Sequence, residues 1–189
     1  MSAIIAAGLR SVENKPLGAQ QQAADATYGR WITIPRTLCF VQYDQNILLI
    51  KRGPHRRVFP NQFNGIGGHV ERDEDPYSGA QREILEETGL EVTDLRLRGI
   101  HNIDAGRNSG IMLFVFTANA VSKAFTDEGA EGKLHWVPIS EVLQLDLVED
   151  IPFILPRILK MDALSPPYFA HVSYDTNDSI VMRIVSTEP

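Results

Sequence analysis

The sequence predicts an α/β protein in which a mixed β-sheet is layered against a few helices. Two observations indicate this fold class: short strand-like segments recur from residue 31 onward, and one strongly marked helix lies among them. The composition agrees, because 43% of the 189 residues are hydrophobic and 22% are charged, close to average globular usage. A chain of this size and composition can bury a core, so we expect one folded domain rather than a disordered chain or a coiled coil.

The first 30 residues differ from the rest of the chain. They carry few large apolar side chains and end in an Ala- and Gln-rich stretch at 18–26. We therefore predict a loosely structured arm at 1–30 and the folded domain at 31–189. No basic residues precede the weak apolar patch at 4–7, and no apolar run reaches the roughly 18 residues that a membrane span needs. We expect a cytoplasmic protein without membrane contacts.

Strand-like segments predict the sheet. The first two, at 31–43 and 46–52, flank a turn-forming Asp-Gln-Asn. The second contains a continuous apolar run at 47–50, which is typical of a strand covered on both faces. Later strands are predicted at 91–102, 111–120, 133–137, 168–174 and 179–185, and two short helices at 140–145 and 152–161.

The main helix is predicted from residue 76 to residue 88 by signals at both ends. Asp75 can cap it, Pro76 suits its first position and Gly89 suits the position just after its end. Three residues have the spacing expected for packing on the core: Tyr77, Ala80 and Ile84.

A second face of this helix carries three acids. Glu83, Glu86 and Glu87 stand at i, i+3 and i+4, which places their carboxylates on one stripe. Such a stripe is either a solvated acidic face or a site for a cation, because close like charges destabilise a helix unless something offsets them. Mg²⁺ favours carboxylate oxygens, waters and substrate phosphates as ligands. The glycines before the helix, Gly67 and Gly68, allow the backbone to pass close to such an ion.

The overall charge favours the cation site. A net charge of −6 and a pI near 5.3 are the opposite of the basic balance typical of proteins that hold nucleic acid by its phosphates. We expect no stable nucleic-acid binding, and handling of phosphate through recruited metal ions. The single cysteine, Cys39, excludes an intrachain disulfide, and its apolar neighbours favour a small buried side chain over a nucleophile.

The segment from Gly68 to Leu90 fits the pattern G-x5-E-x7-R-E-U-x-E-E-x-G-U at every specified position, where U is a bulky aliphatic residue. This pattern is the Nudix box, and the chain resembles the Nudix hydrolases, in particular the MutT-like and human-type 8-oxo-dGTP diphosphatases. The resemblance implies an α/β/α sandwich with a mixed β-sheet. It also implies metal-assisted attack of water on a phosphorus atom, with Mg²⁺ as the cofactor and Mn²⁺ as a possible substitute.

The resemblance assigns roles to residues of the box. Glu83, Glu86 and Glu87 would bind the metal together with the Gly67 carbonyl, and Arg82 would orient Glu83. Gly68, Glu74 and Gly89 would shape the box, with Glu74 supporting the loop or metal-bound waters. A further carboxylate from a later loop would serve as an extra metal ligand or as a base. Glu131, five residues before Trp136, is favoured over Glu128, and a solvated loop acid is the alternative for either.

The flanks of the box resemble the same enzymes and suggest the substrate. Asn64 stands where those relatives read the purine edge, and its amide offers a donor and an acceptor. Glu149 and Asp150 resemble paired acids that bond the modified base, although they could instead cap the following helix. Leu147 stands where the human-type enzymes stack a Trp on the base, and leucine has no aromatic face to offer.

The basic loop at 51–57, which includes Arg52, could meet substrate phosphates or could be a solvated loop end.

The leading hypothesis is a hydrolase that converts a nucleoside triphosphate to a monophosphate and pyrophosphate, with 8-oxo-dGTP as a plausible substrate. One alternative is another Nudix hydrolase, acting on ADP-ribose, a nucleotide sugar, a dinucleoside polyphosphate or an RNA 5′ end. A non-catalytic nucleotide-binding regulator is the other. Partners are expected to be small nucleotides, and the protein a monomer or a homodimer.

Overall fold

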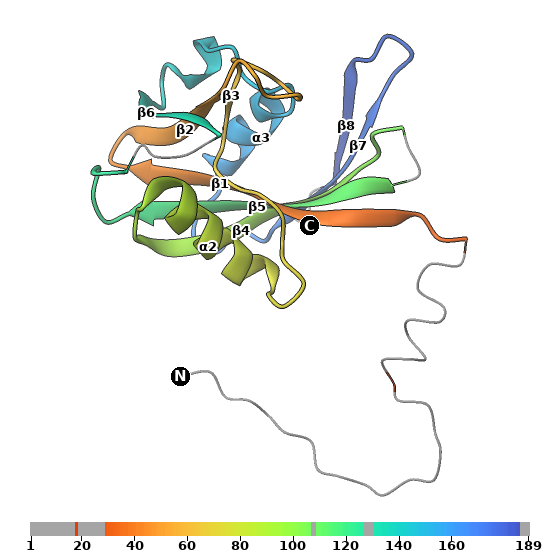
Figure 1. The fold of residues 1–189 in the computed structure, drawn as a ribbon, viewed down its shortest axis with the longest axis horizontal. Coiled ribbons are helices and arrows are strands. Elements are labelled where there is room, and N and C mark those ends of the chain that lie inside the picture. The colour runs from red at the N-terminus through yellow and green to blue at the C-terminus, as the bar shows by residue number, and fades with distance from the viewer. Residues whose placement is uncertain (1–17, 19–28, 107–108, 127–130, 186–189) are drawn as a thin grey trace, which may run out of the picture. The chain divides into compact units, whose positions relative to one another are not determined.

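The computed structural model describes residue 18 and residues 29–106, 109–126 and 131–185. The arm predicted at 1–30 therefore lies outside the described residues, apart from Gly18, Gly29 and Arg30. The elements are the strands β1 (Ile32–Tyr43), β2 (Asn46–Arg52), β3 (Phe63–Asn64), β4 (Val92–Ile103), β5 (Ser109–Ala120), β6 (Gly132–Pro138), β7 (Tyr168–Tyr174) and β8 (Ile180–Val185), and the helices α2 (Pro76–Thr88), η1 (Val142–Gln144) and α3 (Ile151–Ile158) (Figure 1).

The strands form one mixed sheet. Its order is β3-β2-β1-β5-β4-β7-β8, and β6 pairs with β2 off this path. The neighbours β4 and β7 run parallel, whereas β1 with β2 and β4 with β5 run antiparallel. The predicted α/β/α sandwich with a mixed sheet is confirmed.

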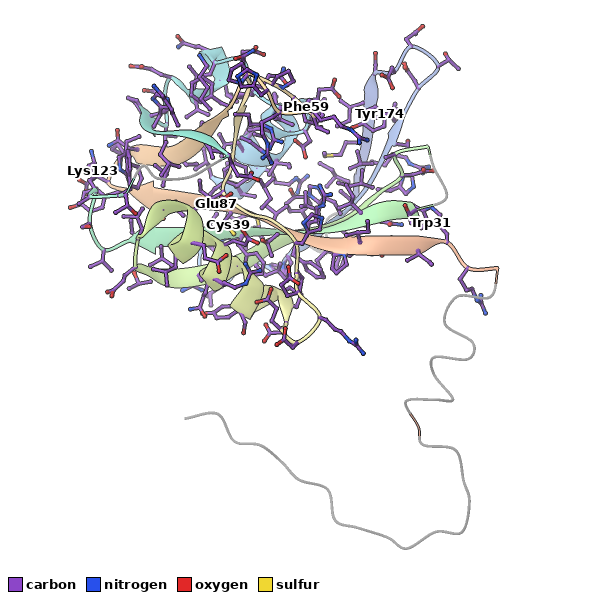
Figure 2. All side chains as sticks on the ribbon, viewed as in Figure 1. Trp31, Cys39, Phe59, Glu87, Lys123 and Tyr174 are labelled. Atoms are coloured by element: carbon purple, nitrogen blue, oxygen red, sulfur yellow. The ribbon has the colours of Figure 1, made fainter. Side chains whose placement is uncertain are left out.

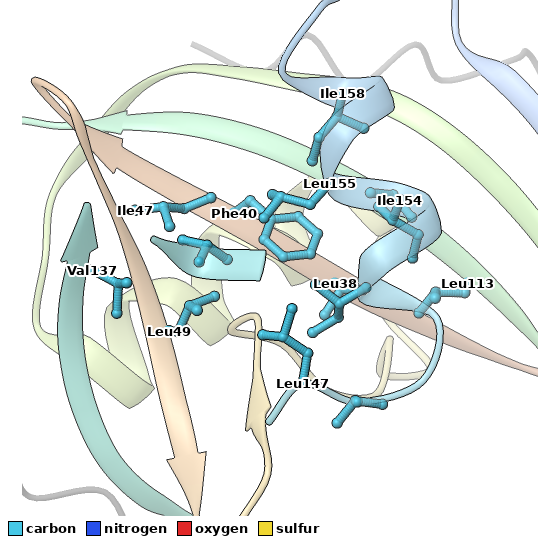
Figure 3. Close-up of a cluster of buried hydrophobic side chains, with 14 of the residues drawn as sticks. Leu38, Phe40, Ile47, Leu49, Leu113, Val137, Leu147, Ile154, Leu155 and Ile158 are labelled. Atoms are coloured by element: carbon cyan, nitrogen blue, oxygen red, sulfur yellow. The ribbon is translucent and has the colours of Figure 1, made fainter. Parts of the chain in front are cut away.

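Two hydrophobic cores lie on opposite faces of the sheet. Along β1 the side chains alternate between them, with Leu38 and Phe40 in one core and Cys39 and Val41 in the other. The first core contains α3, as Figure 3 shows, and the second contains α2. Both cores also take side chains from β2, so the apolar run at 47–50 is covered on both faces as predicted.

Helix α2 is bounded as its sequence predicts. The Asp75 carboxylate accepts hydrogen bonds from the backbone N–H groups of Tyr77 at 2.8 Å and Ser78 at 3.0 Å. At the other end Gly89 has a φ of 67°, and its N–H donates to the Leu85 carbonyl at 2.8 Å. These two caps fix where the helix begins and ends.

One of the three residues of α2 predicted to pack on the core, Tyr77, does not lie inside it. Ala80 and Ile84 are buried, but Tyr77 is 47% exposed. The Tyr77 ring reaches this core only through an edge contact with Phe116, with the ring centroids 6.4 Å apart. The helical spacing gave the correct direction for Tyr77, but this first-turn residue lies at the margin of the core, where water still reaches the ring.

The later helices are shorter than predicted. The segment expected as a helix at 140–145 forms only the 3₁₀ turn η1, and α3 ends at Ile158 rather than at 161. Within the described part of the chain, no helix is long and apolar enough to cross a membrane.

Candidate metal and nucleotide site

The loop between β3 and α2 is fastened to β1 by backbone hydrogen bonds. Cys39 and Ile66 exchange two such bonds at 2.6 and 3.0 Å, and the Thr37 N–H donates to the Gly68 carbonyl at 2.9 Å. The bonds hold the glycine turn of this loop at a fixed place beside α2. The site is therefore built on the sheet rather than on a free loop.

Two glycines let this turn approach the acids of α2. Gly67 has a φ of +146°, and its N–H donates to Glu87 Oε2 at 3.1 Å. A Cβ atom at Gly67 would collide with the Thr37 carbonyl, and one at Gly68 would collide with the Glu83 carboxylate. Gly67 needs glycine because its φ is positive and the Thr37 backbone fills the space of a side chain. A side chain at Gly68 would instead displace the Glu83 carboxylate.

We expect Gly67→Ala to lower the free energy of unfolding by about 3 kcal/mol, because the variant combines a disfavoured backbone conformation with a backbone collision. Gly106→Ala is the matched control: Gly106 also has a positive φ, 72°, but a Cβ there meets nothing within 4 Å. The control should lose only about 1 kcal/mol. Urea unfolding of both variants measures the difference, and equal losses would show that the collision at Gly67 is unimportant.

Arg82 lies at the centre of the acidic cluster. Its Nε and Nη2 donate to the two oxygens of Glu74 at 3.0 and 2.7 Å. Its Nη1 donates to Glu83 at 3.0 Å and to Glu86 at 2.8 Å, and Nη2 also reaches the His69 carbonyl at 3.0 Å. One guanidinium thus orients three carboxylates and ties them to the loop. Glu74 also accepts the Glu71 N–H at 2.8 Å, which suits the loop-supporting role proposed for it.

The carboxylates of Glu83 and Glu87 are poorly compensated. Burial raises the pKa of Glu83, the bonds from Arg82 oppose this, and the charges of Glu86 and Glu131 add to it. For Glu87, burial raises the pKa to about 7, the charges of Glu131 and Glu83 add to this effect, and the Gly67 N–H and the charge of Arg52 oppose it. Burial raises the pKa of the Cys39 thiol, and the charge of Glu87 adds to this; both residues are labelled in Figure 2. The ionised forms of these two carboxylates, Glu83 and Glu87, are therefore destabilised, and a bound cation would relieve the repulsion between them.

Glu131 directly precedes β6, far along the chain from helix α2. Its charge raises the pKa of both Glu83 and Glu87, so the three acids interact electrostatically. It also forms a salt bridge with Arg56 at 2.5 Å. The alternative acid, Glu128, lies outside the described residues.

The carboxylate oxygens of this cluster suit a hard divalent cation. In the described part of the chain, however, no three or more His, Cys, Asp or Glu side chains are already arranged to hold a metal ion. Arg82 draws Glu83 and Glu86 to itself, and Glu87 bonds the Gly67 N–H. The two acids beside the turn, Glu83 and Glu87, offer carboxylate oxygens as ligands. Mg²⁺ typically takes only one or two carboxylates and completes its shell with waters and substrate phosphates, so this partial arrangement fits it.

The two segments that carry the residues predicted to read the base meet at strand β3. The Phe63 N–H donates to the Asp146 carbonyl at 2.8 Å, and the Val148 N–H donates to the Phe63 carbonyl at 3.0 Å. This pairing, which includes a bridge between Phe63 and Leu147, places Asn64 beside the segment at 147–150. The Asn64 Oδ1 accepts the Gly65 N–H at 3.0 Å, which fixes the orientation of its amide.

Asp150 stands at the N-terminus of α3 but does not cap it, since its side chain makes no capping hydrogen bond. Its Oδ1 is buried and has no hydrogen-bond partner among the described residues. Burial raises the pKa of Asp150 to about 6, the neighbouring Glu149 adds to this, and the backbone N–H groups of Asp150 and Ile151 oppose it. Glu149 itself is exposed. The capping alternative is therefore wrong for the Asp150 side chain, which is left with an unused polar atom.

The basic loop approaches the metal side of the site. Arg52 donates from Nε to the Val58 carbonyl at 3.0 Å, and its charge lowers the pKa of Glu87. From its sequence we interpreted this loop either as a phosphate contact or as a solvated loop end. The bond from Arg56 to Glu131 was missed, because the two residues lie 75 positions apart and no local pattern relates them.

The chain belongs to the NUDIX domain family, whose model matches residues 33–158. The chain is 29% identical over 147 residues to an oxidized purine nucleoside triphosphate hydrolase of Mus musculus, an alignment that covers 77% of this chain and 89% of the relative. It is 27% identical over 132 residues to the Nudix hydrolase YvcI of Bacillus subtilis (strain 168), covering 68% of this chain and 80% of that one.

A solved structure shows the same likeness. The MutT protein of Bacillus halodurans superposes with a TM-score of 0.69 and 27% identity, over 82% of this chain and 99% of that chain. The protein is a MutT-like Nudix hydrolase, and thus a pyrophosphohydrolase.

Proposed function

We propose that this hydrolase uses Mg²⁺ to convert a nucleoside triphosphate into a monophosphate and pyrophosphate, and that its substrate is an oxidised purine nucleotide such as 8-oxo-dGTP. One observation carries the proposal: the Gly67–Gly68 turn bonds the Glu87 carboxylate and packs against that of Glu83. The charge of Glu131, from a distant part of the chain, raises the pKa of both glutamates and supports it. We also propose one folded domain at 31–189, and the family match over residues 33–158 supports its start.

The metal ligands in this proposal are carboxylate oxygens of Glu83, Glu86 and Glu87, with the Gly67 carbonyl and Glu131 completing the set. Bound Mg²⁺ would neutralise the polyphosphate, polarise its phosphoryl oxygens and lower the pKa of a bound water. The chain supplies the geometry. Arg82 keeps Glu83 in one orientation, and the bond from the Gly67 N–H does the same for Glu87.

The chemical step is the attack of a water oxygen on phosphorus. The new P–O bond forms as the P–O bond to the bridging oxygen breaks, the departing phosphate group keeps that electron pair, and a carboxylate takes the water proton. Glu131 is the carboxylate we favour for the proton, because its own partner, Arg56, is exposed enough to move. Phosphoryl transfer depends mainly on positioning and charge stabilisation, so the reaction requires no covalent nucleophile.

Base recognition is proposed for Asn64, Glu149 and Asp150. An oxidised purine differs from its parent by a carbonyl at C8 and an N–H at N7, so it offers an additional acceptor and donor. The buried, unpartnered Oδ1 of Asp150 could accept from such an N–H, and a pKa near 6 allows the group to act as donor or acceptor near neutral pH. The name of the Mus musculus relative supports this substrate class.

A panel of Mg²⁺ complexes tests the substrate: 8-oxo-dGTP, dGTP, ADP-ribose, a nucleotide sugar, a dinucleoside polyphosphate and a capped RNA, each followed by chromatography of its products. We expect 8-oxo-dGTP to have the highest kcat/KM and to yield a monophosphate and pyrophosphate. Faster hydrolysis of ADP-ribose or of another member would overturn the substrate and keep the enzyme class. Absence of turnover for every member would instead favour a binding protein.

Asp150→Asn should lower the preference for 8-oxo-dGTP over dGTP by about tenfold, mainly through a higher KM for 8-oxo-dGTP, because an amide that cannot change its charge replaces a buried carboxyl. Steady-state kinetics on both nucleotides measures the ratio. Glu141→Gln, at an exposed acid before η1, is the control for loss of one charge. An unchanged ratio in Asp150→Asn would remove this residue from base recognition.

A further inference from the structure

We propose that Arg56 is a counter-ion latch for the site: it pairs with Glu131 in the free protein and moves to the substrate phosphates when a metal–nucleotide complex binds, which frees Glu131 for the metal. This inference rests on the proposed function, because it needs a cation and a phosphate at the glutamate cluster. It adds a role for a loop residue outside the Nudix box.

The backbone places Arg56 over Glu131. Strands β2 and β6 pair up to their ends, with Arg52 opposite Gly132, and the Gly53 N–H then donates to the Glu131 carbonyl at 3.0 Å. The Arg56 N–H closes a turn on the Gly53 carbonyl at 3.1 Å. A Cβ atom at Gly132 would collide with the Lys51 carbonyl, so the two segments pack as closely as glycine allows. The loop therefore leaves β2 directly opposite Glu131.

The Arg56–Glu131 salt bridge can be broken at little cost in free energy. Each of the two side chains is 37% exposed, and an ion pair in contact with water contributes little to stability. The charge of Glu131 also raises the pKa of Glu83 and of Glu87, so the three carboxylates repel one another. Glu131 thus pairs with one partly exposed cation beside carboxylates whose negative charge Arg82 and Arg52 offset only in part.

Two competitions follow from this position. A metal ion at the cluster competes with Arg56 for Glu131, because both are cations that need the same carboxylate. A substrate phosphate competes with Glu131 for Arg56, because a guanidinium binds phosphate through paired, charge-assisted hydrogen bonds. A metal ion alone offers only the first new partner, whereas a metal–nucleotide complex offers both at once. Loss of Arg56 should therefore have opposite effects on the two ligands.

The test is a pair of titrations on the full chain and its Arg56→Met variant. Mn²⁺ binding without nucleotide, followed by electron paramagnetic resonance, should become about three- to tenfold tighter in the variant, since a positive charge beside the ion is removed. The KM for Mg²⁺–8-oxo-dGTP should rise about five- to twentyfold, with kcat changed by less than about twofold. Arg56→Lys should restore the KM only in part, because it keeps the positive charge but lacks the paired hydrogen bonds of a guanidinium.

Two controls separate the latch from a general charge effect. Arg57→Met removes the same charge from an exposed neighbour that forms no salt bridge with any residue in the described ranges, and it should change the Mn²⁺ affinity by less than about twofold. In a Glu131→Gln background, most of the effect of Arg56→Met on Mn²⁺ affinity should disappear, since the pair no longer exists.

The outcomes are distinct. If the unaltered protein binds Mn²⁺ but Arg56→Met binds it equally or more weakly, the latch is overturned while the metal site stands. If Arg57→Met reproduces the full effect, the loop acts through its overall charge, and the latch is again overturned. If the unaltered protein binds no Mn²⁺ at all, the proposed function fails, and the latch fails with it.

Discussion

Glu83→Gln is expected to reduce turnover of Mg²⁺–nucleotide by about a hundred- to a thousandfold while the chain stays folded. Glutamine has almost the same shape, and its carbonyl can still accept the bond that Arg82 Nη1 gives to Glu83 at 3.0 Å. What it loses is the negative charge on the side chain that packs directly against the Gly68 backbone. The loss should therefore fall on kcat, because it removes charge from the group that holds the metal beside the scissile bond.

Glu71→Gln is the control for this variant. Glu71 is an exposed acid of the same loop and contributes its backbone N–H, which donates to Glu74. It should retain turnover within about twofold. Circular dichroism of both variants checks the fold. Normal turnover in a folded Glu83→Gln protein would remove Glu83 from the metal site.

Glu87→Gln is expected to abolish activity and yet to stabilise the metal-free protein, by about 2 kcal/mol at about pH 8. The folded-state pKa of Glu87, about 7, lies above its ordinary value of 4.5, because the carboxylate is buried near Glu131 and Glu83. The charge therefore costs nothing below pH 4.5, costs increasingly more between 4.5 and 7, and costs its full amount above 7. Glutamine carries no charge at any pH and can still accept the Gly67 N–H.

Urea unfolding at about pH 5 and about pH 8, without and with Mg²⁺, measures the difference in unfolding free energy between the variant and the unaltered protein. The gap between the variant and the unaltered protein should widen as pH rises. Mg²⁺ should close it by stabilising only the protein that keeps Glu87. A gap independent of pH would mean that burial does not shift the Glu87 carboxyl as the structure indicates.

The two glutamate variants describe a site at which the fold tolerates unfavourable charge for the sake of function. Arg82 answers part of the repulsion by bonding Glu74, Glu83 and Glu86. Glu87 has no such partner, so the remaining cost concentrates on it. Active sites commonly show this pattern, with titratable groups shifted by burial and by like charges.

Local patterns explain why much of the fold could be predicted from the sequence. The caps of α2 at Asp75 and Gly89 depend on neighbouring residues only, and the apolar run at 47–50 predicts a two-sided strand from its own composition. The box residues also share one helical stripe and one loop, so their spacing alone brings them together. The prediction for Tyr77 was wrong because helical spacing gives a direction but not the limit of the core.

Contacts between distant segments could not be predicted in this way. The bridge from Phe63 to Leu147 and the salt bridge from Arg56 to Glu131 each join segments far apart in the chain, and neither has a periodic or compositional signal. The sequence also does not predict the unpartnered oxygen of Asp150, because an acid directly before a helix is usually interpreted as its N-cap. These long-range features carry the substrate and latch proposals.

The central claim is that carboxylates of one helical stripe gather a divalent cation beside the glycine turn. A Mn²⁺ titration followed by electron paramagnetic resonance, comparing the unaltered protein with the double variant Glu83→Gln/Glu87→Gln, tests it most directly. The account predicts saturable binding in the unaltered protein and at least about tenfold weaker binding in the double variant. Equal affinity in the two proteins, or no binding in either, would contradict it.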